Sequence, residues 1–150
     1  MEPRKPRSPR GPAGRRHRAL ILHIDGSVEG NPGPGAIGVV VEGEDGTLVE
    51  AWGEAIGHVT NNQAEYRALL AGLEKARHLG AKAVTVRSDS QLLVRQLLGQ
   101  YRVKDSKLKP LHEEARRLAG SFERFAIEHV RREANRAADR LANQARLNQP

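Results

Sequence analysis

The sequence predicts an α/β domain in which a five-stranded mixed sheet is flanked by helices. A continuous apolar run at residues 19–24 suits a central strand that is covered on both faces. Two strand-like runs follow with Asp45-Gly46 between them, and Asp-Gly in this position is typical of a β-hairpin. Further along the chain, strand-like and helical segments alternate, which indicates strands connected through helices. Together, these observations predict one sheet with both antiparallel and parallel pairs.

The elements can be placed in order along the chain. The strands are expected at residues 19–24, 36–44, 47–56, 83–87 and 122–130. The long helix opens at residues 60–63 and ends before Gly80, because apolar residues recur at helical spacing between them. A short helix then runs from Ser90 to about Leu98, a basic loop spans residues 100–108, and Pro110 starts the next helix. The last helix is expected at residues 135–147.

Length and composition exclude several classes of protein. The 150 residues suit one domain with its own core. The chain contains no cysteine, which excludes a disulfide scaffold, a thiolate zinc site and a Cys nucleophile. No apolar run approaches the length of a membrane span, and the basic amino-terminal residues are not followed by the apolar stretch of a secretory signal. We therefore expect a cytoplasmic monomer that contacts no membrane.

Positive charge is concentrated near the amino terminus. The formal net charge is +7, and residues 1–18 hold seven Lys and Arg residues against one Glu, whereas residues 19–150 hold 18 basic and 17 acidic residues. Residues 1–18 are also poor in apolar side chains, so we expect a disordered basic tail ahead of a folded domain at 19–150. Two functions are open for the tail, which are to keep the protein soluble or to bind the phosphate backbone of a nucleic acid.

Four acidic residues lie where a site is expected in such a sheet. Asp25 follows the first strand and Asp89 follows the fourth, and ligand sites gather beyond the carboxyl ends of central strands. Glu65 lies in the first turn of the long helix and Asp139 in the last helix, and both helices can face that edge. Converging carboxylates repel one another, and a bound cation relieves the repulsion. Oxygen ligands without His or Cys favour Mg²⁺ or Mn²⁺ over zinc.

Each acid also has a structural explanation, which is the simpler one when the acids are taken one at a time. These explanations are a tight turn for Asp25-Gly26, a capping box at residues 62–65 for Glu65, an N-cap for Asp89, and a surface ion pair of Asp139 with Arg136 or Arg140. The occurrence of all four acids at the ends of suitable elements favours a shared site.

The segments around these acids resemble the four motifs of the type 1 ribonuclease H family. In chain order they are Asp25-Gly-Ser-Val-Glu-Gly-Asn-Pro-Gly-Pro-Gly35, Thr60-Asn-Asn-Gln-Ala-Glu65, Ser88-Asp-Ser-Gln91 and Asn135-Arg-Ala-Ala-Asp-Arg-Leu-Ala142. One such motif is a weak signal, but four in the family's order and spacing are specific. The resemblance covers residues 19–147 and implies the ribonuclease H-like fold, with residues 19–150 as a catalytic domain.

The resemblance implies an endonuclease that hydrolyses the RNA strand of RNA–DNA hybrids and leaves a 5′-phosphate and a 3′-hydroxyl. Such sites hold two ions about 4 Å apart, here Mg²⁺ or Mn²⁺. By the resemblance, Asp25 bridges both ions and Asp139 helps hold the ion beside the attacking water. Glu65 contacts the other ion and the RNA 2′-hydroxyl, and Asp89 completes the ligand set.

Further residues correspond to the family's contacts with nucleic acid and to its product-release residue. The substrate contacts are Asn31, Asn61, Asn62, Gln91 and Asn135, some of which are expected to reach the minor groove, where 2′-hydroxyls distinguish RNA from DNA. Family members place a mobile His before the last helix for product release. His129 has the matching distance from Asp139 but is expected to lie in a strand, and Arg131 or Arg132 takes its place if the loop is shorter.

The chain departs from many bacterial members of the family between Leu97 and Lys109. This segment is too short for their basic, aromatic protrusion, which grips the hybrid, so the basic tail is a candidate substitute. The overall pattern is most similar to a compact, archaeal-like branch that lacks the protrusion. Some members of that branch accept double-stranded RNA, and the sequence leaves this substrate open.

The same residues bear on other possible functions. Residues 33–38 fit the G-x-G-x-x-G pattern of dinucleotide-binding folds, but a strand and not a helix is expected to follow. A non-catalytic module that binds hybrids would be free to lose the four acids, and all four are present. A related nuclease of the same fold with another substrate is an open alternative. The serines beside the acids lack the strained elbow motif of a Ser hydrolase.

Overall fold

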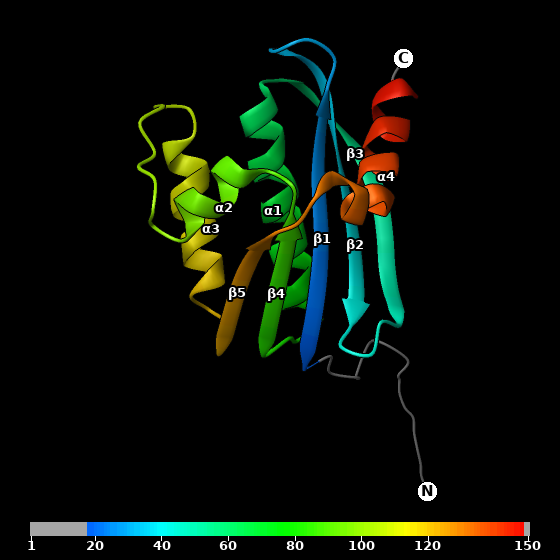
Figure 1. Cartoon of the computed structure of the whole chain (residues 1–150), viewed down its shortest axis with the longest axis vertical. Helices are drawn as coiled ribbons and strands as arrows, with labels where there is room; N and C mark the ends of the chain where they lie inside the picture. Colours follow the sequence, from blue (N-terminus) through cyan, green and yellow to red (C-terminus); the bar gives the residue numbers. More distant parts are fainter. Residues whose placement is uncertain (1–17, 149–150) are drawn as a thin grey trace, which may run out of the picture.

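The computed structural model describes residues 18–148, so the tail predicted at 1–18 lies outside the described residues except for Arg18. The chain forms one five-stranded sheet with helices on both faces (Figure 1). The strands are β1 (Ala19–Val28), β2 (Gly33–Gly43), β3 (Leu48–Val59), β4 (Ala83–Ser88) and β5 (Arg124–His129). The helices are α1 (Asn61–His78), α2 (Gln91–Leu97), α3 (Lys109–Ala119), the 3₁₀ turn η1 (Arg132–Asn135) and α4 (Arg136–Leu147). The predicted fold class and element order are confirmed.

Strand β1 lies at the centre of the sheet, in which the strand order is β3-β2-β1-β4-β5. It pairs antiparallel with β2 and parallel with β4, and β4 pairs parallel with β5. The register places Ile24 opposite Ser88, so the next residue on each strand, Asp25 and Asp89, lies at the same edge of the sheet. The two carboxyl ends meet as the sequence predicts.

Different helices cover the two faces of the sheet. Leu20, Leu22 and Ile24 are at most 2% exposed and face α1, which is so close that a Cβ added at Gly72 would lie 3.2 Å from Leu22 Cδ1. Helix α3 packs beside α1 on this face (Figure 1). Helix α4 covers the other face, because a Cβ added at Gly38 would lie 2.1 Å from the carbonyl oxygen of Ala138. Helix α4 therefore rests directly on the backbone of β2.

Several element boundaries differ from the expected ones. Strand β1 continues to Val28 although its apolar run ends at Ile24, because residues 25–28 pair with β2. Strand β5 is shorter than predicted, and Phe122 contributes to the core from the turn before it. The hairpin turn at Asp45-Gly46 is confirmed, with Gly46 at φ +85°. Residues 33–38 lie inside β2 with no helix after them, which excludes the dinucleotide-binding alternative.

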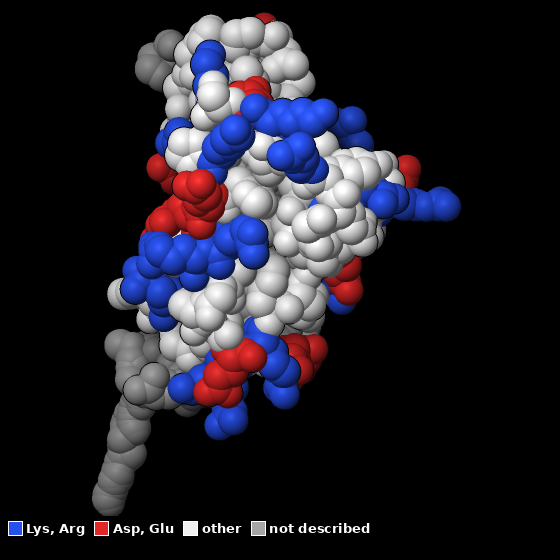
Figure 2. Space-filling view, turned by 90° about the vertical axis from the view of Figure 1, so that its left-hand side faces the viewer, with Lys and Arg blue, Asp and Glu red and all other residues white. Residues whose placement is uncertain are grey.

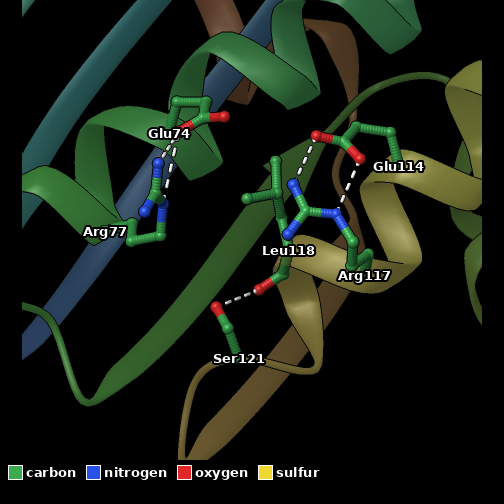
Figure 3. Close-up of polar contacts among 6 residues, drawn as sticks. All are labelled: Glu74, Arg77, Glu114, Arg117, Leu118 and Ser121. Carbon is green, nitrogen blue, oxygen red and sulfur yellow. Dashed lines mark hydrogen bonds and ion pairs between the residues drawn. The ribbon is translucent and has the colours of Figure 1, made fainter.

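Charged side chains cover the side of the molecule formed by β5, α2 and α3. Figure 2 shows Lys and Arg side chains gathered in patches on this side, with acidic groups beside them. Two ion pairs lie on the neighbouring helices α1 and α3, where Arg77 Nη2 is 2.7 Å from Glu74 Oε1 and Arg117 Nη2 is 2.6 Å from Glu114 Oε2 (Figure 3). The hydrogen bond from Arg117 holds the pKa of Glu114 below its usual range, and the charge of Arg77 acts in the same direction. Exposed pairs of this kind contribute little to stability, so they do not explain the fold.

Helix length and hydropathy also bear on membrane association. Among residues 18–148, we find no helix with both the length and the apolar character that a membrane span requires.

Candidate metal centre

The four predicted acids come together at the edge where β1 and β4 end. Asp25 lies in β1, Glu65 in α1, Asp89 directly after β4 and Asp139 in α4. Carboxylate oxygens of Asp25, Glu65 and Asp89 all lie within 4.8 Å of one another. Asp139 lies near them, and its charge helps to raise the pKa of Asp25. A cavity of about 580 Å³ opens onto all four residues.

Asp25 is held within a strand, so the tight-turn explanation for Asp25-Gly26 is wrong. Asp25 pairs with Gly38 of β2 and is only 4% exposed. The neighbouring Gly26 allows α1 to approach the strand, because an added Cβ there would lie 2.8 Å from Ala64 Cβ and 2.9 Å from the backbone nitrogen of Glu65. The missing side chain at position 26 therefore sets how near Glu65 comes to Asp25.

Glu65 is free to face the site because other residues cap its helix. The capping box of α1 consists of Thr60 and Gln63, with Gln63 N donating to Thr60 Oγ1 at 3.1 Å and Thr60 N donating to Gln63 Oε1 at 2.8 Å. The predicted box at residues 62–65 is wrong, and Glu65 is the fifth residue of α1, beyond the expected first turn. Its Oε1 instead accepts a hydrogen bond from Gly26 N at 3.1 Å.

The structural explanations for the other two acids are also wrong. The N-cap of α2 is Ser90 and not Asp89, since Ser90 Oγ accepts from Leu93 N at 3.2 Å. In the described part of the chain, the ion-pair partner of Asp139 is neither Arg136 nor Arg140. It is Arg132, whose Nη2 lies 3.7 Å from Asp139 Oδ1. Both acids are therefore available to a shared site.

Burial and mutual repulsion make this cluster unfavourable when all its members are charged. Burial is the largest cause that raises the pKa of Asp25 to about 9, followed by the charges of Glu65 and Asp89 and the hydrogen bond and charge of Asp139. Burial likewise raises the pKa of Glu65 to about 8, aided by Asp89, while the hydrogen bond from Gly26 N acts in the opposite direction. A divalent cation among these oxygens would offset the repulsion and favour the ionised forms.

The chemistry of the donor set fits such a cation. Every ligand atom in the cluster is a carboxylate oxygen, and Mg²⁺ and Mn²⁺ prefer oxygen donors. The four acids come from separate elements that are packed against one sheet, so the ligand set is fixed by the fold and not by a flexible loop.

Basic and acidic residues at the end of β5 and in the segment after it line the same cavity. They are His129, Arg131, Arg132 and Glu133. His129 is exposed and is the last residue of β5, so it lies in a strand, as the sequence predicts. Glu133 was not anticipated as part of the cavity. Its place in η1 beside Arg132 depends on a 3₁₀ turn that the sequence pattern did not show.

The sequence and the fold match known proteins. The sequence profile of the reverse transcriptase-like family matches residues 23–145. The crystal structure of ribonuclease H1 from the halophilic archaeon Halobacterium salinarum superposes with a TM-score of 0.83 and 43% identity, over 85% of this chain and 96% of that one. This chain belongs to the type 1 ribonuclease H family. Its similarity to an archaeal member agrees with the compact branch indicated by the sequence.

Two further ribonuclease H structures are similar over nearly their whole length. One is the amino-terminal ribonuclease H domain of the Mycobacterium tuberculosis protein Rv2228c, with a TM-score of 0.83, 44% identity and coverage of 85% of this chain and 93% of that one. The other is LC11-RNase H1, isolated from compost and solved in complex with an RNA/DNA hybrid, with a TM-score of 0.80, 39% identity and coverage of 85% and 96%.

The full-length ribonuclease H relatives are longer than the region they share with this chain. The chain is 45% identical to ribonuclease HI of H. salinarum over 132 residues, which are 88% of this chain and 64% of that protein. It spans 35% of the bifunctional Rv2228c protein of M. tuberculosis, at 46% identity. The shared region is therefore the ribonuclease H domain, and the rest of these relatives has no counterpart in the match.

The predicted substrate contacts divide into four exposed residues and one buried residue. Asn31, Asn61, Asn62 and Gln91 are exposed, and Asn31 Oδ1 accepts from Asn61 N at 2.9 Å, which ties the loop after β1 to the start of α1. Asn135 is only 2% exposed, and its Nδ2 donates to Ile24 O at 2.8 Å. The expectation that Asn135 contacts substrate is therefore corrected, because its side chain points into the protein.

Proposed function

We propose that this chain is a metal-dependent endoribonuclease that hydrolyses the RNA strand of RNA–DNA hybrids, leaving a 5′-phosphate and a 3′-hydroxyl. The observation that carries the proposal is the cluster of carboxylate oxygens within 4.8 Å of one another, supplied by three separate parts of the sheet and its helices. Membership of the ribonuclease H family supports the same reaction, and the relative LC11-RNase H1 was solved with an RNA/DNA hybrid.

The four acids would hold two divalent cations, Mg²⁺ or Mn²⁺. When bound, such a pair supplies an activated water and stabilises the leaving oxygen of a phosphodiester. Asp25 interacts with each of the other three acids, which suits a ligand shared by both ions. Asp139 approaches from α4 and suits the ion beside the water, whereas Glu65 approaches from α1 and suits the other ion and the RNA 2′-hydroxyl. One chain supplies all four acids, so a monomer suffices.

The surface around the acids offers contacts for both strands of a hybrid. The amides of Asn31, Asn61, Asn62 and Gln91 are exposed and can donate to and accept from 2′-hydroxyls and base edges in the minor groove. Beyond α2, Arg102, Lys109 and Arg116 line a groove of about 630 Å³. Cations there would attract phosphates.

Product release would involve the basic residues at the mouth of the cavity. His129 ends β5, and Arg132 lies 3.7 Å from Asp139 with a 77% exposed side chain. A side chain this exposed can leave the acid when a product phosphate arrives and can rejoin it afterwards. Arg132 and His129 are therefore both candidates for this role.

A cleavage assay with one labelled RNA strand tests the proposal. The strand is supplied as a hybrid with DNA, as an RNA duplex and alone, each with Mg²⁺, with Mn²⁺ or with a chelator. We expect cutting of the hybrid that requires metal and leaves a 5′-phosphate. Cutting of the RNA duplex as well would broaden the substrate class. Tight binding of the hybrid without any cutting would overturn the enzymatic proposal in favour of a binding module.

The basic segment at residues 1–18 is expected to strengthen hybrid binding, because it carries seven of the 25 Lys and Arg residues. Phosphate contacts release counterions, so each contact steepens the fall of log K with log salt by about 0.9 for a B-form duplex. The full chain and residues 19–150 should therefore differ in hybrid affinity at low salt and converge at high salt. A chain in which the seven tail cations are replaced by Gln is the matched control. Equal affinities and equal slopes for the full and shortened chains would leave the tail as a solubilising segment only.

A further inference from the structure

Asn135 occupies a capping position but does not cap its helix. It directly precedes α4, and Asn is favoured there because its side-chain oxygen accepts hydrogen bonds from the first N–H groups of a helix. The Asn135 side chain makes no such bond. Its Nδ2 instead donates to the carbonyl oxygen of Ile24, 111 positions earlier in the chain, at 2.8 Å.

The surroundings of Asn135 require a donor at this position. The residue is 2% exposed, and within residues 18–148 its Oδ1 is buried without a hydrogen-bond partner. Turning the amide over would bring Oδ1 against Ile24 O, so that two acceptors would face each other. The side chain thus keeps one bond to β1 at the expense of an unsatisfied acceptor, which is an unusual arrangement for a buried amide.

The bond from Asn135 reaches the peptide that joins Ile24 to Asp25. Asp139 lies four residues further along the chain, in the first turn of α4. Asp139 lines the same cavity as Asp25. The chain entering α4 is therefore tied to β1 through Asn135, and the first turn of α4 then brings Asp139 to the cavity that Asp25 lines.

The other contacts of α4 do not fix this end of the helix in the same way. The close approach of Ala138 to Gly38 sets the distance of α4 from the sheet, but van der Waals contact does not set direction. A second directional contact lies in the later part of the helix, where Ser27 Oγ donates to Asn143 Oδ1 at 2.6 Å. Asn135 supplies the corresponding contact at the end that precedes Asp139.

We propose that Asn135 is a positioning residue of the metal centre and makes no contact with substrate. Its bond to Ile24 O holds the start of α4 on β1 and so fixes where Asp139 stands relative to Asp25. The inference rests on the proposed metal-dependent function and deepens it. It predicts that the Asn135 side chain affects metal binding and turnover but not affinity for the hybrid.

Asn135→Leu in the full chain tests this role, because Leu has a similar volume and removes both the donor and the unsatisfied acceptor. Mn²⁺ binding is measured by titration calorimetry, and kcat and KM are measured on a hybrid. We expect Mn²⁺ binding weaker by about 10- to 100-fold and a comparable loss of kcat, as for other residues that orient metal ligands. The KM for hybrid should change little, and the Tm without metal should fall less than in Leu118→Ala, since one hydrogen bond is lost and no large cavity is made. Asn135→Ala is the second variant. It removes the same hydrogen bond but is smaller than Leu, so it controls for strain that the Leu side chain introduces.

Leu118→Ala is the control for a general loss of stability, because Leu118 is 1% exposed in α3 and away from the acids. This substitution should lower the Tm but leave the Mn²⁺ affinity unchanged at temperatures below the unfolding transition. A raised KM with unchanged Mn²⁺ binding in the Asn135 variants would make Asn135 a substrate contact and overturn the proposal. Unchanged Mn²⁺ binding and kcat, or equal loss of Mn²⁺ binding in Leu118→Ala, would also overturn it. If the wild-type chain bound Mn²⁺ without cutting hybrid, the proposed function would fail alone, and the calorimetry would still decide the role of Asn135.

Discussion

Asp25→Asn should lower the rate of hybrid cleavage by about a thousandfold or more while the fold persists. Asp25 feels the charge of each of the other three acids, and we propose its carboxylate as the ligand that both cations would share. An amide in its place supplies a neutral oxygen and loses the electrostatic stabilisation on which such a transition state depends. Single-turnover cleavage of a hybrid at saturating Mg²⁺ measures the effect, with circular dichroism to show that the fold is retained.

The same substitution should stabilise the protein when metal is removed. The folded pKa of Asp25 is about 9 against an ordinary value of 3.8, so the folded chain binds the proton more tightly than the unfolded chain does. Stability from this group is therefore complete below about pH 4 and is lost as the pH rises toward 9. The gain in Tm of Asp25→Asn over wild type, measured in chelator, should grow between pH 5 and 9. The pKa of Glu65 is also raised, to about 8, so part of the pH dependence of the Tm should remain in the Asp25→Asn variant.

Asp45→Asn is the matched control for both measurements, because Asp45 lies exposed in the turn between β2 and β3. It makes the same chemical change far from the acidic cluster and should leave both cleavage and the pH dependence unchanged. Near-normal turnover by folded Asp25→Asn would remove Asp25 from the reaction. A Tm that falls in that variant at pH 8 in chelator would contradict the repulsion on which the metal site is argued.

Gly38→Ala should reduce both stability and cleavage, although Gly38 is not part of the site. The new Cβ would lie 2.1 Å from Ala138 O and 2.8 Å from Ala142 N, and neither backbone atom can move unless α4 moves with it. Overpacking of this kind lowers the free energy of unfolding by about 1–3 kcal/mol. Displacement of α4 also carries Asp139 away from Asp25, and a misplacement of about 1 Å can reduce a rate by about a hundredfold. Urea denaturation and the hybrid cleavage rate measure the two effects.

Gly43→Ala is the control for the added methyl group on the same strand. Its Cβ would meet Asp45 Oδ1 at 3.2 Å, and this flexible side chain can give way. We expect this variant to retain its stability within about 0.5 kcal/mol and to cut hybrid at the normal rate. If Gly38→Ala behaved in the same way, α4 would not depend on close approach to β2.

The order of the elements could be predicted because apolar periodicity and turn residues are local properties of the chain. The end of β1 could not be, since residues 25–28 become a strand only by pairing with β2, although the apolar run stops at Ile24. The four acids could be selected because each one follows a recognisable strand or lies in a recognisable helix. Asn135 was assigned to the substrate from the family resemblance, because nothing local in the sequence shows where its side chain points. An Asn before a helix is normally a cap, and only the packing of α4 on β1 shows that its amide is used elsewhere.

The acidic cluster draws on both ends of the described chain, with β1 as its first strand and α4 as its last helix. The tie between Asn135 and Ile24 closes a loop of 111 residues, and contacts of such long range form late because loop closure is entropically unfavourable. A chain still emerging from the ribosome therefore cannot assemble the four carboxylates until α4 has left the exit tunnel. Before that point, the nascent chain would lack the complete acidic cluster and would not cleave a hybrid. The onset of metal binding would therefore report that the whole domain has folded.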